Sequence, residues 1–182
     1  MTQEEKNQII DMTLSAIGRI NHPRFFRSER GYQGELYCRL REEFLSQNLL
    51  DERMLEPEYQ KRPTDHLTQQ RPDIIYHIPA PAEGEVFINN YTVWALKLRA
   101  DHPDVISDFE KLYEMISLLQ YPLAVFLNID SDSHYLHDCI PDYRNRIVAF
   151  TTMRNEAEGK LVICKAYYDR NDLQEEFYSV DW

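Results

Sequence analysis

Cysteine and glycine are both scarce in this chain of 182 residues, and each shortage excludes a class of protein. The three cysteines, Cys38, Cys139 and Cys164, are widely separated and form no CxxC pair, so neither a disulfide framework nor a zinc knuckle is expected. The five glycines build no GxGxxG or P-loop motif, and GxSxG is also missing. Nothing in the sequence therefore supports nucleotide-driven or covalent catalysis.

Long apolar runs are missing as well, and the 20 basic residues are outnumbered by 31 acidic ones. The most apolar stretch, residues 123–129, is far shorter than the ~20 residues that cross a bilayer, and the N-terminal residues lack a secretory pattern. We therefore expect a cytoplasmic protein that has reduced thiols and does not contact a membrane.

The formal net charge of −11 disfavours tight nonspecific binding to DNA, because Lys and Arg supply most of the affinity for phosphates. Two arrangements would allow nucleic-acid binding in spite of this charge. Carboxylates gathered around a metal ion are neutralised by it, and a basic partner subunit can supply the missing charge.

An apolar fraction of 43% spread along the whole length indicates one folded domain, residues 1–182. Apolar residues recur at helical spacing in residues 2–19, 32–50 and 105–119, the last with Asp104 or Ser107 as its cap. Runs of β-branched and aromatic residues predict strands at 55–60, 71–78, 86–99, 123–129, 146–153 and 160–168. The expected class is α/β, with a single mixed central sheet flanked by helices.

The connections are also predicted from composition. Residues 61–66, 79–84 and 155–159 are expected to be turns or loops, and the aromatic pair in residues 23–27 is expected to pack down. Residues 175–182 form an aromatic and acidic tail, which either docks on a partner or closes the core.

Two neighbouring predicted strands carry residues suited to phosphodiester hydrolysis. Pro72-Asp73 opens one strand, and Lys97 follows Ala95 by two positions in the middle of the next. Alternate residues of a strand share a face, so positions 95 and 97 project together. Hydrolysis with a divalent metal needs hard oxygen ligands on a rigid frame and a group that compensates charge.

This pattern resembles the PD-(D/E)xK nuclease superfamily. Glu35, on a helix before the two strands, occupies the place where that superfamily often has a further acid, and the order of helix, PD strand, lysine strand and helix also corresponds. The resemblance divides the chain into an N-terminal helix and connector (1–30), a family-like core (31–130), and C-terminal strands and tail (131–182). It implies a restriction-endonuclease-like core.

The resemblance also implies a role for each matching residue. Asp73 would bind Mg²⁺ or Mn²⁺, the Leu96 carbonyl would add a ligand, and Glu35 would bind the metal directly or through water. Lys97 would position the attacking water or stabilise charge that develops on the phosphate.

Ala95 departs from the pattern, because the superfamily has Glu, Asp or another polar ligand at this position. A methyl group cannot bind a metal, so we expect a chain with low metal affinity and little or no activity. A deliberate Glu to Ala change and a natural loss both produce this residue, and the survival of Asp73, Lys97 and Glu35 favours the former.

The sequence thus predicts a metal-dependent nuclease subunit that acts on nucleic acid, DNA favoured, in a prokaryotic defence or genome-maintenance assembly. It would work with a protein partner or as a homo-oligomer. A naturally inactive nuclease-like fold that serves as a binding module is the alternative, and an acidic inhibitor that mimics nucleic acid is a third. The sequence does not decide whether the substrate is DNA or RNA, whether cleavage is internal or from an end, or which sequence or structure is recognised.

Each residue also has a simpler interpretation. Asp73 alone fits a turn, and Glu35 alone fits a solvated helix. The spacing of His134 and His137 fits a polar surface loop better than a metal site. A group of arginines near the Glu35 helix fits phosphate contacts and surface ion pairs equally well: Arg24, Arg27, Arg30, Arg39 and Arg41.

Overall fold

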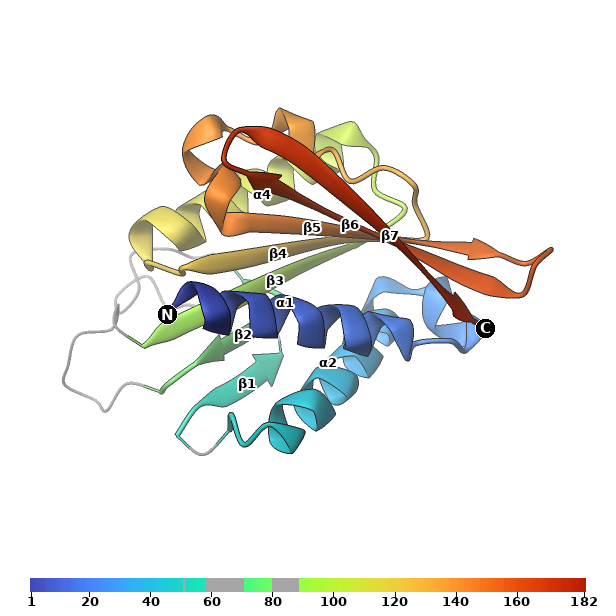
Figure 1. Cartoon of the computed structure of the whole chain (residues 1–182), viewed down its shortest axis with the longest axis horizontal. Coiled ribbons are helices and arrows are strands. Elements are labelled where there is room, and N and C mark those ends of the chain that lie inside the picture. Colours follow the sequence, from blue (N-terminus) through green and yellow to red (C-terminus); the bar gives the residue numbers. More distant parts are fainter. Residues whose placement is uncertain (51, 58–70, 80–88) are drawn as a thin grey trace.

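The computed structural model describes residues 1–50, 52–57, 71–79 and 89–182. Within them the chain builds one seven-stranded sheet whose strands lie side by side in sequence order, β1 to β7 (Figure 1). This confirms the predicted α/β class with a single mixed sheet. The turn expected at 61–66, the start of the strand expected at 86, and the loop expected at 79–84 beyond Pro79 lie outside the described residues.

The seven strands span Met54–Pro57, Ile74–His77, Asn90–Leu98, Leu123–Ile129, Ile147–Asn155, Lys160–Asp169 and Asp172–Asp181. The three central strands, β3, β4 and β5, are parallel to one another, and the remaining neighbours pair antiparallel. A helix connects β3 to β4, as a parallel pair requires.

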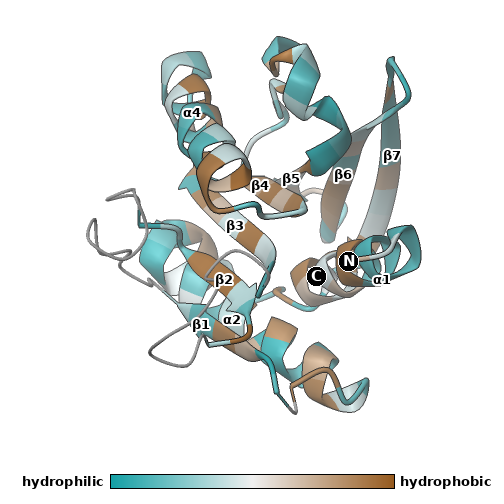
Figure 2. Cartoon of the chain, turned by 90° about the vertical axis from the view of Figure 1, so that its left-hand side faces the viewer, coloured by the Kyte–Doolittle hydropathy of each residue, from teal (hydrophilic) through white to brown (hydrophobic). Residues whose placement is uncertain are grey.

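Two helices, α1 (Gln3–Gly18) and α2 (Glu29–Ser46), cover one face of the sheet, and α4 (His102–Leu118) covers the other (Figure 2). The described residues also form three short 3₁₀ helices, η1 (Pro23–Arg27), η2 (Leu136–Asp138) and η3 (Pro141–Arg146). No helix in the described part of the chain is long and apolar enough to cross a membrane.

Strand β3 contributes side chains to both apolar layers. Trp94 and Leu96 are fully buried against the layer of α1 and α2, whereas Val93 and Ala95 face the layer of α4. Because the faces alternate, Lys97 also projects toward α4, as the sequence predicted.

Two helices begin earlier than predicted. Helix α2 begins at Glu29 rather than near Tyr32, because the Ser28 side chain accepts a hydrogen bond from the Gly31 N–H and caps the first turn. Helix α4 begins at His102, and its cap is Asp101 rather than Asp104 or Ser107. A proline in the first turn of α4 is compatible with this start because the first N–H groups of a helix need no partner within it.

The C-terminal tail is a strand, which the sequence did not predict. Residues Asp172–Asp181 form β7 and pair with β6 along its whole length. At the end of β7, the Trp182 ring lies 5.9 Å from the ring of Phe26, which is buried in η1 as expected for the aromatic pair. The tail therefore packs against the rest of the domain.

Candidate functional site

The difference in length between β2 and β3 creates the site. Strand β2 begins at Ile74, which pairs with Trp94, but β3 continues to Leu98. Beyond Trp94 the backbone donors on this edge of β3 have no strand partner among the residues that the structure describes. The Oδ2 of Asp73 accepts a hydrogen bond from the Leu96 N–H at 2.7 Å, and a Glu29 oxygen accepts one from the Leu98 N–H at 3.2 Å.

A pocket of about 120 Å³ opens beside this edge, between β3 and α4. Asp73, Ala95 and Lys97 all line it, so the structure brings together three residues that the sequence singled out. Arg71, which precedes Asp73 in the chain, and Asp108 and Lys111 of α4 are the other charged residues of the lining.

Asp108 is the most deeply buried charged group of the pocket. Only 3% of the residue is exposed, and its Oδ2 lies 3.7 Å from the Lys97 Nζ. Its Oδ1 accepts a hydrogen bond from the Lys111 Nζ at 2.5 Å. A buried carboxylate is unfavourable without such partners, so Lys97 and Lys111 compensate the charge of Asp108.

The local charges shift the pKa values of two residues. The pKa of Asp73 is raised from 3.8 to about 6, mainly by burial; the Leu96 N–H and Lys97 lower it, and the charges of Glu29 and Asp108 contribute to the rise. Burial lowers the pKa of Lys97, but the carboxylates around it outweigh this effect, so its pKa lies above the ordinary value. Lys97 is therefore a cation at neutral pH. Perturbed groups in a pocket are typical of functional sites.

Leu96 contacts the site through its backbone. In a strand, the N–H and C=O of one residue point to the same side, so the carbonyl that was predicted as a metal ligand lies on the same edge as the N–H that binds Asp73. The leucine side chain is buried on the opposite face of the sheet.

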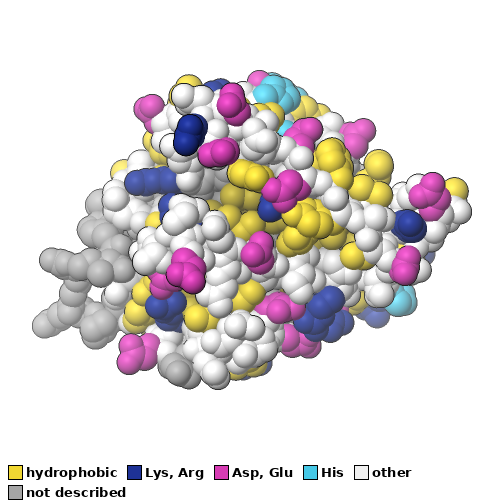
Figure 3. Space-filling model, viewed as in Figure 1, with side chains coloured by type: hydrophobic (Ala, Val, Ile, Leu, Met, Phe, Trp, Pro, Cys, Tyr) yellow, Lys and Arg dark blue, Asp and Glu magenta, His cyan; other side chains and the backbone are white. Residues whose placement is uncertain are grey.

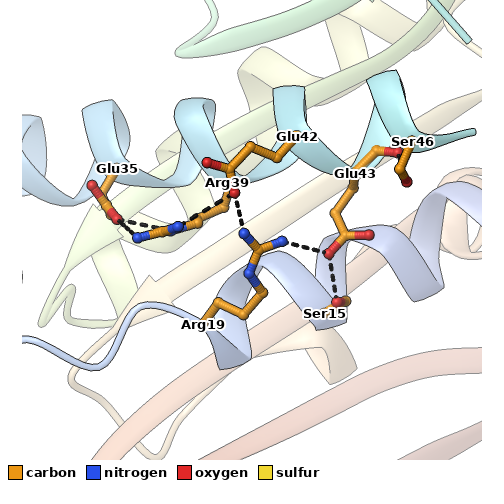
Figure 4. Close-up of polar contacts among 7 residues, drawn as sticks. All are labelled: Ser15, Arg19, Glu35, Arg39, Glu42, Glu43 and Ser46. Carbon is orange, nitrogen blue, oxygen red and sulfur yellow. Dashed lines mark hydrogen bonds and ion pairs between the residues drawn. The ribbon is translucent and has the colours of Figure 1, made fainter. Parts of the chain in front are cut away.

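Glu35 lies elsewhere. It does not line the pocket, and its Oε1 accepts hydrogen bonds from Arg39, with Nε at 2.8 Å and Nη2 at 2.7 Å. Figure 4 shows this pair within a chain of polar contacts between α1 and α2, made by Ser15, Arg19, Glu35, Arg39, Glu42 and Glu43. The structure therefore places Glu35 and Arg39 in surface ion pairs.

The α2 residues that reach the site are Glu29 and Gln33, one helical turn apart. Gln33 is buried, and its Nε2 donates a hydrogen bond to the Asp73 carbonyl oxygen at 2.8 Å. Together with the Leu96 N–H, this bond fixes both the backbone and the carboxylate of Asp73. Sequence reasoning missed Glu29 because α2 starts earlier than its apolar pattern indicates. It missed Gln33, which lies inside the predicted helix, because only the packing of α2 on the sheet brings its side chain to Asp73.

Asp108 was missed as well, although the sequence contains a signal for it. It lies among Val105, Phe109 and Leu112, which are fully buried in the layer between α4 and the sheet. An acid within an apolar helical stripe is unusual because charged residues are rarely buried unless they are paired.

Three histidines lie beside carboxylates outside this pocket. His134 Nε2 lies 2.7 Å from Glu175, and both His102 and His137 approach Asp138, at 2.9 and 3.1 Å. In the parts of the chain that the structure describes, no group of three or more His, Cys, Asp or Glu side chains is arranged to hold a metal by itself.

A scan against protein families and searches of curated proteins and of solved structures gave no match to this chain. The chemistry of the pocket is therefore the basis on which a function is assigned.

Proposed function

We propose that the chain is a metal-dependent nuclease subunit that hydrolyses phosphodiester bonds, with DNA as the favoured substrate. One observation carries the proposal: Asp73, which directly precedes β2, and Lys97 of the neighbouring strand β3 line a single pocket together with Ala95. The order of helix, PD strand, lysine strand and helix in the fold is the order that the resemblance to the PD-(D/E)xK superfamily implies.

The pocket suits Mg²⁺ or Mn²⁺. Asp73 offers a hard oxygen, since only its Oδ2 has a hydrogen-bond donor among the described residues, and Asp108 adds a second carboxylate. The Leu96 carbonyl lies on the same edge. Mg²⁺ is commonly bound by only one or two carboxylates, with waters and substrate phosphates as its other ligands. When bound, it would withdraw charge from the phosphate.

Lys97 contributes positive charge rather than base catalysis, because its raised pKa keeps the ammonium protonated. In hydrolysis, the oxygen of water bonds to phosphorus, the bond from phosphorus to one sugar oxygen breaks, and a proton passes to the released oxygen. Negative charge builds up on the phosphate oxygens in between. An ammonium fixed at the pocket stabilises that charge.

The net charge of −11 favours action within an assembly. The proposal places this assembly in the cytoplasm of a prokaryote, in defence or genome maintenance. A basic partner, or another copy that contributes basic residues, would hold the nucleic acid. On the face shown in Figure 3, acidic side chains are mixed with Lys and Arg. Asp73 and Lys97 line the same pocket. Both features argue against an acidic mimic of nucleic acid.

The test is cleavage of plasmid and single-stranded substrates with Mg²⁺ and Mn²⁺. Ala95→Glu restores the acid that the pattern expects, so this variant should cleave, and a further Asp73→Ala or Lys97→Ala change should abolish the cleavage. The proposal fails if Ala95→Glu cleaves neither DNA nor RNA, alone or with the products of neighbouring genes.

A second function, a nuclease-like fold that only binds partners, is favoured by one observation, the methyl group of Ala95 in the pocket. It predicts that neither the natural chain nor Ala95→Glu cleaves, while pull-down with neighbouring gene products recovers a stable complex.

A further inference from the structure

Asp108 and Ala95 lie on opposite walls of the same pocket, one on α4 and the other on β3. Ala95 leaves space where a longer acidic side chain would stand, and the carboxylate of Asp108 reaches the pocket from the helix that covers this face. The pocket therefore contains a second acid, although position 95 does not supply it.

The partners of Asp108 belong to the site. Its Oδ2 is 3.7 Å from the Nζ of Lys97, the residue that the proposed function places beside the phosphate. Its negative charge also acts on Asp73, in the direction expected for two acids that share a site. Asp108, Lys97 and Asp73 therefore form one electrostatic unit.

We propose that Asp108 supplies the second carboxylate of the metal site, in place of an acid at position 95, so that Asp73 and Asp108 hold the divalent cation between β3 and α4. This inference rests on the proposed function. It has a consequence opposite to the expectation from the sequence: the chain with Ala95 binds the metal and cleaves.

Asp108 could instead serve only as a counterion for the lysines. A substitution of Lys111 distinguishes this role from metal binding. The Lys111 side chain is 43% exposed, so its ammonium can move into water when a cation takes its place on Oδ1. The ammonium and the metal compete for this carboxylate. Removal of the ammonium should therefore tighten metal binding if Asp108 is a ligand, and should only destabilise the fold if Asp108 is a counterion.

The experiment is a calorimetric titration of the metal-free protein with Mn²⁺, with plasmid nicking measured on the same samples. The variants are Asp108→Asn, Lys111→Met, Ala95→Glu and the double variant Asp108→Asn/Ala95→Glu. Glu110→Gln is the matched control, since it removes one negative charge from the exposed side of α4. Circular dichroism melts without metal confirm that each variant is folded.

We expect the natural chain to bind Mn²⁺ and nick the plasmid. Asp108→Asn should weaken binding by at least about tenfold, Lys111→Met should strengthen it, and Glu110→Gln should change neither property. Ala95→Glu in the Asp108→Asn background should restore binding, because the carboxylate then enters from the opposite wall. If Asp108→Asn does not fold, the direction of the Lys111→Met effect decides the question.

Two failures are distinguishable. If the natural chain neither binds nor nicks but Ala95→Glu does both, Asp108 is only a counterion and the nuclease proposal stands. Equal Mn²⁺ affinity for the natural chain and Asp108→Asn overturns the role of Asp108 in the same way. If neither the natural chain nor Ala95→Glu binds Mn²⁺ or nicks, the proposed function itself is refuted.

Discussion

Replacement of Asp73 by asparagine should stabilise the metal-free protein at neutral and alkaline pH. The asparagine has almost the same shape, and its side-chain oxygen can accept the hydrogen bond from the Leu96 N–H that Asp73 accepts now. What the variant removes is a negative charge that is mostly buried and lies near the carboxylates of Glu29 and Asp108.

The magnitude follows from the pKa of Asp73, which rises from 3.8 to about 6 in the folded protein. A shift of about two units corresponds to roughly 3 kcal/mol of destabilisation when the group is ionised. The sign follows from proton binding: between these two values the folded state binds more protons than the unfolded state, so stability falls as pH rises. The destabilisation is small near pH 4 and complete above about pH 7.

The assay is urea unfolding of the natural chain and Asp73→Asn in the presence of a chelator, at a series of pH values. The difference in unfolding free energy between the two proteins should be small at about pH 4 and should grow to roughly 3 kcal/mol at about pH 8, in favour of Asp73→Asn. Other titrating groups cancel in this difference. A difference that does not change with pH, or a variant that is less stable at about pH 8, would refute the reasoning.

Three further predictions concern the groups that hold the site and the fold. Gln33→Leu leaves the Asp73 carbonyl without its buried donor, so urea unfolding should show a loss of about 1–3 kcal/mol, and the Mn²⁺ affinity should also fall. Trp94→Ala empties a fully buried position between the sheet and α1, and we expect a loss of about 3–5 kcal/mol in the same assay. Arg39→Ala removes only partly exposed ion pairs to Glu35 and Glu42; a loss of more than about 1 kcal/mol, or any change in Mn²⁺ affinity, would contradict the placement of Glu35 outside the site.

Local patterns were sufficient to predict most of the helices and strands. Strand β4, Leu123–Ile129, has the predicted bounds because it is a short apolar run between polar segments, and all of it is buried. Strand β7 was missed because its exposed side chains, several of them acidic, alternate with residues that are only partly buried; at the edge of the sheet no strongly apolar face is required.

The candidate site could be predicted only where its residues lie on paired strands. Asp73 and Lys97 follow from the two-residue period of β3 and from the pairing of β2 with β3, both of which are local properties. Asp108 could not be assigned in this way, since its partner Lys97 belongs to another element and only the packing of α4 on the sheet brings the two together. Glu35 matched the expected order of elements, but the packing of α2 turns it toward Arg39 and away from the pocket, and the order of elements does not predict this packing.

The hydrogen bond from the Leu96 N–H holds the Asp73 carboxylate in place whichever amino acid stands at position 95. Every amino acid except proline has a backbone N–H, so this anchor depends on the path of β3 and not on its side chains. Substitutions at position 95 can therefore change the chemistry of the pocket while Asp73 keeps its place. Natural or designed substitutions can therefore change which side chains bind a ligand at this edge of the sheet without changing the backbone of β3.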